Sequence, residues 1–131
     1  MNSTYGPPNT FGYLDGSIAI PQVRAALNVL VGDGQELAGF AESHQCVSGG
    51  AYLDPRSDTG EVVLAYCQYE SDHCYRTTVH DRHDLREERE LVVIGYADLF
   101  RAANWQISEF REPDQNGVEW IVRLILTPPV V

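Results

Sequence analysis

The sequence predicts an α+β fold in which an antiparallel sheet, built from two helix-hairpin (αββ) units, has its helices packed on one face. Three observations support this class. Two segments carry apolar residues at helical spacing, two strand-like segments follow each of them, and a turn with Pro and Gly separates the strands of each pair. Since one such unit is too small to bury its apolar surface alone, we expect the two units to pair.

The chain begins with a segment that predicts little regular structure. Residues 1–19 are rich in Gly, Pro, Asn, Ser and Thr, and we expect an irregular arm there. The side chains that could anchor this arm to the domain are Tyr5, Phe11, Tyr13 and Leu14. Residues 20–131 are long enough and apolar enough to form a single domain.

The first helix-hairpin unit covers residues 20–69. Pro21 suits the first position of a helix, and apolar residues recur at helical spacing as far as Val31. The glycines at 32 and 34 interrupt this helix, and residues 36–40 are expected to add a further helical turn. Residues 46–53 and 61–69 then form a hairpin around the Pro- and Gly-containing turn at 54–60.

The second unit covers residues 84–127. Residues 74–79 just before it are expected to form a short strand, and Asp84 with Glu87 resembles a capping pair for the next helix. The apolar face of this helix is predicted to consist of Leu85, Val92, Tyr96, Leu99 and Ala103. A competing interpretation makes residues 90–94 a strand, because short apolar runs are ambiguous.

The last hairpin has the clearest pattern. Residues 106–111 and 118–126 flank a turn at 112–117, and Pro128 ends the second strand. Alternation places Trp120, Val122 and Leu124 on one face, and Phe110, Ile121 and Ile125 on the other. Both faces are therefore partly apolar, so the arm or a partner is expected to cover the second one. The two units resemble each other, which indicates either an internal duplication or a chance likeness.

The charge of the chain gives the strongest evidence about its function, because it argues against whole classes of partner. The chain has no lysine, and nine arginines face nineteen carboxylates for a formal net charge of −10. Such a charge argues against direct binding to nucleic acid or to an anionic membrane and favours a basic partner. The missing lysines fit the codon bias of a GC-rich bacterial or phage genome. Without a signal peptide or a long apolar segment, we expect a soluble cytoplasmic protein with reduced cysteines.

Cysteine and histidine suggest a second class of function. A small metal-dependent enzyme could use His80, His83 and Cys74, with Asp81 or Asp84 as the base. The chain contains no Cys-x-x-Cys pair, however, so we assign no metal and no cofactor.

The other two cysteines would lie opposite each other in the first hairpin. If that hairpin is centred between Arg56 and Ser57, Cys46 faces Cys67 across the ladder. A disulfide between them is an alternative to the reduced thiols that we expect in a reducing compartment.

The function that the sequence favours is a non-enzymatic acidic module that binds a protein partner, including a basic one. Toxin-neutralising or immunity-type, DNA-mimicking and phage accessory roles all fit, and self-association is an alternative. The residues expected to bind the partner are Asp81, Asp84, Glu87, Glu88, Phe110 and Ile121.

A winged-helix DNA-binding domain is a third hypothesis. Residues 21–43 would supply its helices and the first hairpin its wing. The acidic residues Glu36 and Glu42 in its recognition helix argue against this function.

Overall fold

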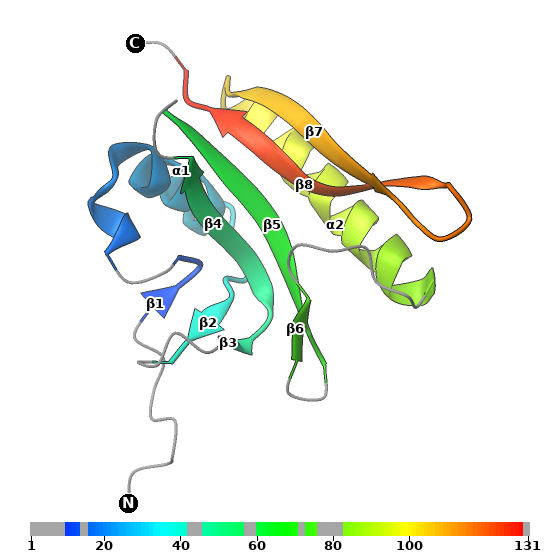
Figure 1. Ribbon diagram of the computed structural model, residues 1–131. Helices are drawn as coiled ribbons and strands as arrows, with labels where there is room; N and C mark the ends of the chain where they lie inside the picture. Colours follow the sequence, from blue (N-terminus) through cyan, green and yellow to red (C-terminus); the bar gives the residue numbers. More distant parts are fainter. Residues whose placement is uncertain are drawn as a thin grey trace, which may run out of the picture.

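A five-stranded antiparallel sheet organises the computed structural model, which describes residues 10–13, 16–41, 46–56, 60–70, 73–75 and 83–129 (Figure 1). Four of its strands lie in the order β4-β5-β8-β7, and a short fifth strand pairs with β5 outside this order. Their bounds are Gly50–Arg56 for β4, Glu61–Glu70 for β5, Glu119–Thr127 for β8 and Gln106–Pro113 for β7. Each hairpin thus keeps its own two strands adjacent, and β5 pairs with β8 where the two units meet.

Both long helices cover the same face of this sheet, which confirms the predicted α+β architecture (Figure 1). Helix α1 spans Pro21–Gly32 and helix α2 spans His83–Ala102. Their buried side chains share one core with the strands because each element has an apolar side to remove from water. This core includes Val23, Ala26 and Leu30 of α1, Val93, Tyr96 and Phe100 of α2, and Leu53, Leu64, Leu124 and Leu126 of the strands.

The segment after α1 corrects one prediction. The helix begins with Pro21 at its first turn and ends at Gly32, as expected, but residues 36–40 form no further helical turn. Instead Leu37 bridges to Ala51, and β2 follows at Gly39–Phe40. Phe40 is buried against Tyr52, with ring centroids 5.2 Å apart, so tertiary packing overrides local helical spacing here. Residues 33–41 therefore contain no helix that could serve as the recognition helix of the winged-helix hypothesis.

A second, smaller sheet forms around β2. Its order is β1-β2-β3, with β1 at Thr10–Phe11 and β3 at Cys46–Ser48. The predicted irregular arm thus contains a strand and also a 3₁₀ turn at Ser17–Ala19. Of its expected anchors, Tyr13 packs against the core and Phe11 is exposed, while Tyr5 and Leu14 lie outside the described residues.

Gly50 divides what the sequence predicts as one strand, residues 46–53, into β3 and β4. Its φ is 142°, and a Cβ atom there would lie 2.6 Å from the backbone carbon of Leu37. Only glycine allows this approach. As a result, β3 pairs with β2 while β4 pairs with β5. A short strand, β6 at His73–Tyr75, also pairs with β5 and begins one residue before the expected segment 74–79, of which residues 76–79 lie outside the described residues.

Helix α2 is continuous through residues 90–94, so the alternative strand there is wrong. Its buried face is also rotated from the predicted one. Leu85, Val92 and Leu99 are only half-buried, whereas Val93 and Phe100 are buried together with Tyr96. The buried side of α2 that contains Val93, Tyr96 and Phe100 extends toward the start of the helix. There its positions are occupied by two arginines, Arg89 and Arg86.

A β-bulge changes the faces of the last hairpin. Phe110 pairs with Arg123 but Arg111 pairs with Ile121, which leaves Val122 as the extra residue. Ile121 and Leu124 consequently both belong to the core beneath the helices. The predicted position of Ile121 on the face opposite Leu124 is therefore wrong, although the hairpin itself and its end before Pro128 are confirmed.

Among the described residues, neither helix has the length and apolar character needed to cross a membrane.

Candidate functional site

Two buried arginines mark the most unusual part of the interior. The ladder between β5 and β8 runs from Val62 and Leu126 to Ala65 and Arg123, and the two strands then diverge (Figure 1). The first turns of α2 place Arg86 and Arg89 on the buried side of the helix, and Arg89 is only 2% exposed. Burying a guanidinium is costly unless it is paired or hydrogen-bonded, so these arginines require polar neighbours.

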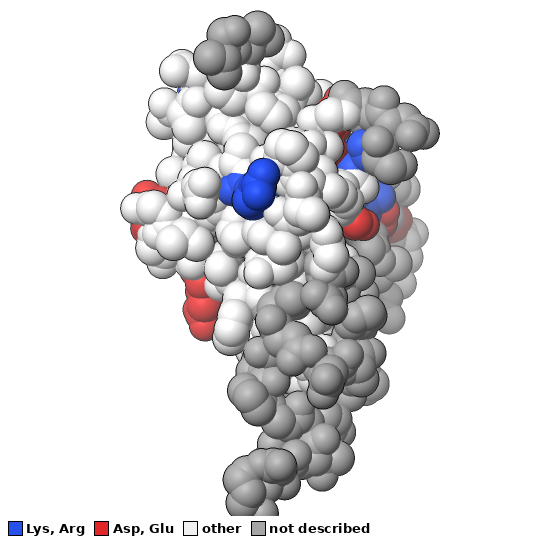
Figure 2. Space-filling view, turned by 90° about the vertical axis from the view of Figure 1, so that its left-hand side faces the viewer, with Lys and Arg blue, Asp and Glu red and all other residues white. Residues whose placement is uncertain are grey.

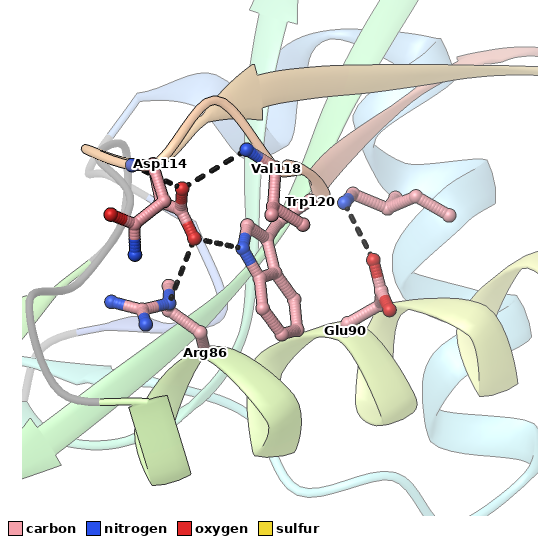
Figure 3. A network of polar contacts seen from close by, with 7 residues as sticks. Arg86, Glu90, Asp114, Val118 and Trp120 are labelled. Atoms are coloured by element: carbon pink, nitrogen blue, oxygen red, sulfur yellow. Dashed lines mark hydrogen bonds and ion pairs between the residues drawn. The ribbon is translucent and has the colours of Figure 1, made fainter.

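Asp114 is the polar neighbour of Arg86. Its Oδ2 lies 3.9 Å from Nε of Arg86, and both side chains are almost fully shielded from water (Figure 3). The guanidinium carbon of Arg86 also lies 5.5 Å from the centroid of the Trp120 ring. An ion pair and a cation–π contact therefore compensate the buried charge together.

The carboxylate of Asp114 also organises the turn between β7 and β8. Its Oδ1 accepts hydrogen bonds from the backbone N–H groups of Asn116, at 2.8 Å, and Val118, at 3.1 Å. The indole N–H of Trp120 donates to Oδ2 at 3.0 Å (Figure 3). The Trp120 hydrogen bond, aided by the two backbone donors and Arg86, lowers the pKa of Asp114 against the opposing effect of burial.

Two further hydrogen bonds attach α2 to the diverging strands. Oε2 of Glu90 accepts from the backbone N–H of Ile121 on β8 at 2.9 Å (Figure 3). From the other diverging strand, β5, Nε2 of the buried Gln68 donates to the carbonyl of Leu85 in α2 at 2.7 Å. We call Gln68, Arg86, Arg89, Glu90, Asp114 and Trp120 the arginine cluster. Its contacts attach the start of α2 to β5, to β8 and to the β7–β8 turn.

A pair of sulfur atoms lies next to this cluster. Sγ of Cys67 is 3.3 Å from Sγ of Cys46, and Cys67 is a buried, reduced thiol. The predicted ladder pairing is wrong, because Gly50 lies opposite Cys67 and Cys46 approaches from the smaller sheet. Cys46 is disulfide-bonded, so the expectation of reduced cysteines is wrong for this residue.

Three of the predicted partner-binding residues lie together. Asp84, Glu87 and Glu88 are exposed on the first turns of α2, and Glu88 accepts a hydrogen bond of 3.1 Å from the Tyr66 hydroxyl. Burial, followed by the neighbouring Glu88 carboxylate, raises the pKa of Tyr66 to about 12. Asp81 lies outside the described residues.

The two predicted aromatic and apolar residues lie elsewhere. Phe110 is half-buried beneath the guanidinium of Arg123, whose carbon is 3.9 Å from the ring centroid. Ile121 is 6% exposed in the core beneath the helices. The backbone N–H of Ile121 donates to Glu90 of α2, but its side chain is buried and does not share the exposed surface of Asp84, Glu87 and Glu88.

Two large apolar side chains on the outer side of α2 were not predicted to bind a partner. Leu91 is 71% exposed and Ile94 is 38% exposed. They are three residues apart and therefore lie on the same side of the helix. The exposed residues Glu87, Glu88 and Asp98 flank them. We call Glu87, Glu88, Leu91, Ile94 and Asp98 the α2 outer face.

The surface charge is less uniform than the sequence implies. Helix α1 contains one charged residue, Arg24, and no carboxylate. On the side of the molecule that carries α1, a basic group lies in a broad neutral central area, and acidic groups appear only toward the margins of this view (Figure 2). Helix α2, by contrast, carries exposed carboxylates at Asp84, Glu87, Glu88 and Asp98.

Within the described residues, no three His, Cys, Asp or Glu side chains come together as a metal site would require. His80 and Asp81 of the hypothetical metal enzyme lie outside the described residues, as do the side chains of Cys74 and His83. Asp84 is exposed at the start of α2.

Comparisons with protein-family models, with curated proteins and with solved structures give no match.

Proposed function

We propose that this protein is a non-enzymatic interaction module that binds a protein partner through the α2 outer face. The observation that carries this proposal is the 71% exposure of Leu91 beside Glu87 and Glu88. A leucine exposed to this extent among carboxylates is unfavourable in water and becomes favourable when a partner covers it.

The chemistry of this face defines the partner. Leu91 and Ile94 provide an apolar centre, and carboxylates surround it. Interfaces commonly combine a desolvated apolar centre with a polar rim. The complementary surface is therefore an apolar groove or helix lined by arginine or lysine, toward which the net charge of −10 accelerates approach.

The arginine cluster supports binding by holding α2 rigid. Contacts from Glu90 to β8 and from Gln68 to the Leu85 carbonyl attach the opposite side of the same helix segment. A helix that is already fixed loses little conformational freedom on binding, which favours affinity. Immunity-type, DNA-mimicking and phage or bacterial accessory roles are all forms of this proposed activity.

The test compares capture of proteins by the wild type and by matched surface variants. Leu91→Ser and Ile94→Ser should each weaken binding of a captured partner about tenfold or more, as loss of about 1.4 kcal/mol implies. Val118→Ser is the control, because Val118 is 53% exposed in the β7–β8 turn and does not belong to the α2 outer face.

The charge requirement is tested with the same partner. Glu87→Lys with Glu88→Lys should slow association, and added salt should weaken wild-type binding. A partner that binds the Leu91 and Val118 variants equally well would disprove this proposal, since its contact would lie elsewhere.

A further inference from the structure

The main sheet, which contains β4, β5, β8 and β7, has one covered edge and one open edge (Figure 1). At the β4 edge, the backbone N–H of Leu53 donates to the carbonyl of Gly12 at 2.7 Å. The N–H of Ala51 donates to the carbonyl of Glu36 at 2.8 Å. At the opposite edge, β7 pairs only with β8 among the described residues. An open edge presents backbone N–H and C=O groups to which another strand can add.

Strand β7 has few of the features that commonly keep a sheet edge from pairing. Lysines, prolines within the strand and β-bulges often protect natural edges. The chain contains no lysine, and the only proline of β7 is its last residue, Pro113. The bulge of this hairpin places its extra residue in β8. Since none of the eight residues of β7 is fully buried, the strand is regular and accessible at this edge.

The charged side chains of β7 are ordered so that a second copy of the strand complements them. Glu109 and Arg111 lie on the same face of the strand, where they pair with each other at 2.8 Å. Phe110 lies on the opposite face, beneath the guanidinium of Arg123. When two antiparallel β7 strands pair about Phe110, Glu109 of each copy lies opposite Arg111 of the other. The contact then contains two pairs of opposite charge and one pair of phenylalanine rings, and both kinds of cross-strand pair are stabilising.

Backbone geometry and charge together select this register. Residues directly opposite each other in an antiparallel pair exchange both backbone hydrogen bonds or neither of them. A symmetric pair of identical strands is therefore centred on a residue and not between two residues. Centring on Glu109 or on Arg111 would place like charges opposite each other, which is destabilising. Centring on Ser108 would place Glu109 opposite Ile107, so only the register centred on Phe110 brings opposite charges together.

We propose that this protein forms a symmetric dimer in which β7 pairs antiparallel with β7 of a second copy, centred on Phe110. The pairing joins the main sheets of the two copies into one continuous sheet. Phe110, which the sequence predicts to bind a partner, lies on the two-fold axis. None of the residues of the α2 outer face belongs to β7, so this dimer does not depend on the proposed function and either can fail without the other.

Sedimentation equilibrium of the full chain over a range of concentrations tests the proposal. The net charge of −10 repels a second copy, so the measurement is made at about 0.15 M ionic strength, where charges are screened beyond about 8 Å. The wild type should show a reversible monomer–dimer equilibrium. Arg111→Glu and Glu109→Arg each place like charges opposite each other and should raise the dimer dissociation constant about tenfold or more. Arg24→Glu on α1 makes the same charge change as Arg111→Glu and should leave this constant unchanged.

Two charge-swap combinations decide between the outcomes, with circular dichroism to verify that each variant is folded. The double variant Glu109→Arg with Arg111→Glu restores both opposite-charge pairs and should dimerise like the wild type. A mixture of the two single variants should form a mixed dimer, because each then meets charges of opposite sign in the other. A wild type that stays monomeric at every concentration would overturn the proposal. A dimer that both single variants leave unchanged, or that the double variant fails to restore, would overturn it as well.

Discussion

Trp120 donates its indole N–H to Oδ2 of Asp114 at 3.0 Å, and the same oxygen lies 3.9 Å from Nε of Arg86 (Figure 3). One carboxylate therefore closes the β7–β8 turn and also attaches that turn to the start of α2. Asp114 thus combines hydrogen bonds within its own turn with a contact to a residue far away in the sequence. The effect of protonating this carboxylate on stability can be measured.

The pH dependence of stability should report on Asp114. Its folded pKa is lowered, chiefly by the Trp120 hydrogen bond, below the value of about 3.9 in an unfolded chain. The charged form therefore stabilises the fold above about pH 4, and this stabilisation is lost as the pH falls through the folded pKa. Asp114→Asn should be less stable than wild type near neutral pH, and the difference should shrink below about pH 4.

Urea unfolding at several pH values measures this difference. Asp98→Asn removes a carboxylate from the exposed side of α2 and controls for the change in net charge. A gap between wild type and Asp114→Asn that stays constant down to strong acid would show that the ionised carboxylate is not what stabilises the turn.

Tyr66 should titrate late for a tyrosine. Burial and the Glu88 carboxylate raise its pKa to about 12, above the value of about 10 in an unfolded chain. The neutral phenol is therefore favoured in the fold, and its contribution to stability is present below about pH 10 and lost toward pH 12. Phenolate absorbance should lose the component near pH 12 in Tyr66→Phe, and that component should shift to lower pH in Glu88→Gln. Tyr96 should still titrate later than Tyr66, because burial raises its pKa further.

Arg89 should be far more important for stability than an exposed arginine. Its side chain is almost fully buried, so truncation leaves a cavity in the interior. Arg89→Ala should lower the free energy of unfolding by about 2–5 kcal/mol. The exposed Arg101→Ala should change it by no more than about 0.5 kcal/mol, and denaturant unfolding of both variants provides the comparison. Equal effects would mean that the Arg89 site is not packed as described.

Two glycines should respond in opposite directions to the same substitution. Gly50→Ala should destabilise the protein by about 1–3 kcal/mol or more, because φ is 142° and the added Cβ meets the backbone of Leu37. Gly95→Ala should stabilise it by about 0.5–1 kcal/mol, because Gly95 lies inside α2 with open space around its Cβ position. Thermal unfolding measures both. A stabilised Gly50→Ala would mean that β3 and β4 are not separated as described.

The positions of individual side chains show where sequence reasoning succeeded. The β7–β8 hairpin was predictable because Glu112 to Gly117 combine turn residues between alternating strands, which is a local signal. The extra residue Val122 was not predictable, because a bulge depends on which strand lies opposite. The same reason explains the wrong face assigned to Ile121.

The two buried arginines were the largest omission. Arg86 and Arg89 lie among carboxylates in the sequence, where helical spacing suggests exposed ion pairs. Extending the apolar stripe of Val93, Tyr96 and Phe100 by one and two turns would have reached them. The sequence alone could not show that Asp114, more than twenty residues away, provides the compensating charge.

The sequence by itself determined the α+β class, the two helix-hairpin units, the acidity and the last hairpin, because periodicity, turn residues and charge act over neighbouring residues. The tertiary structure alone decided that residues 36–40 leave the helical path, that Gly50 divides a strand and that two arginines are buried, with Arg86 beside Asp114. Those outcomes depend on which distant groups share a low-dielectric interior, where the cost of an unpaired charge or a misplaced Cβ exceeds any local preference.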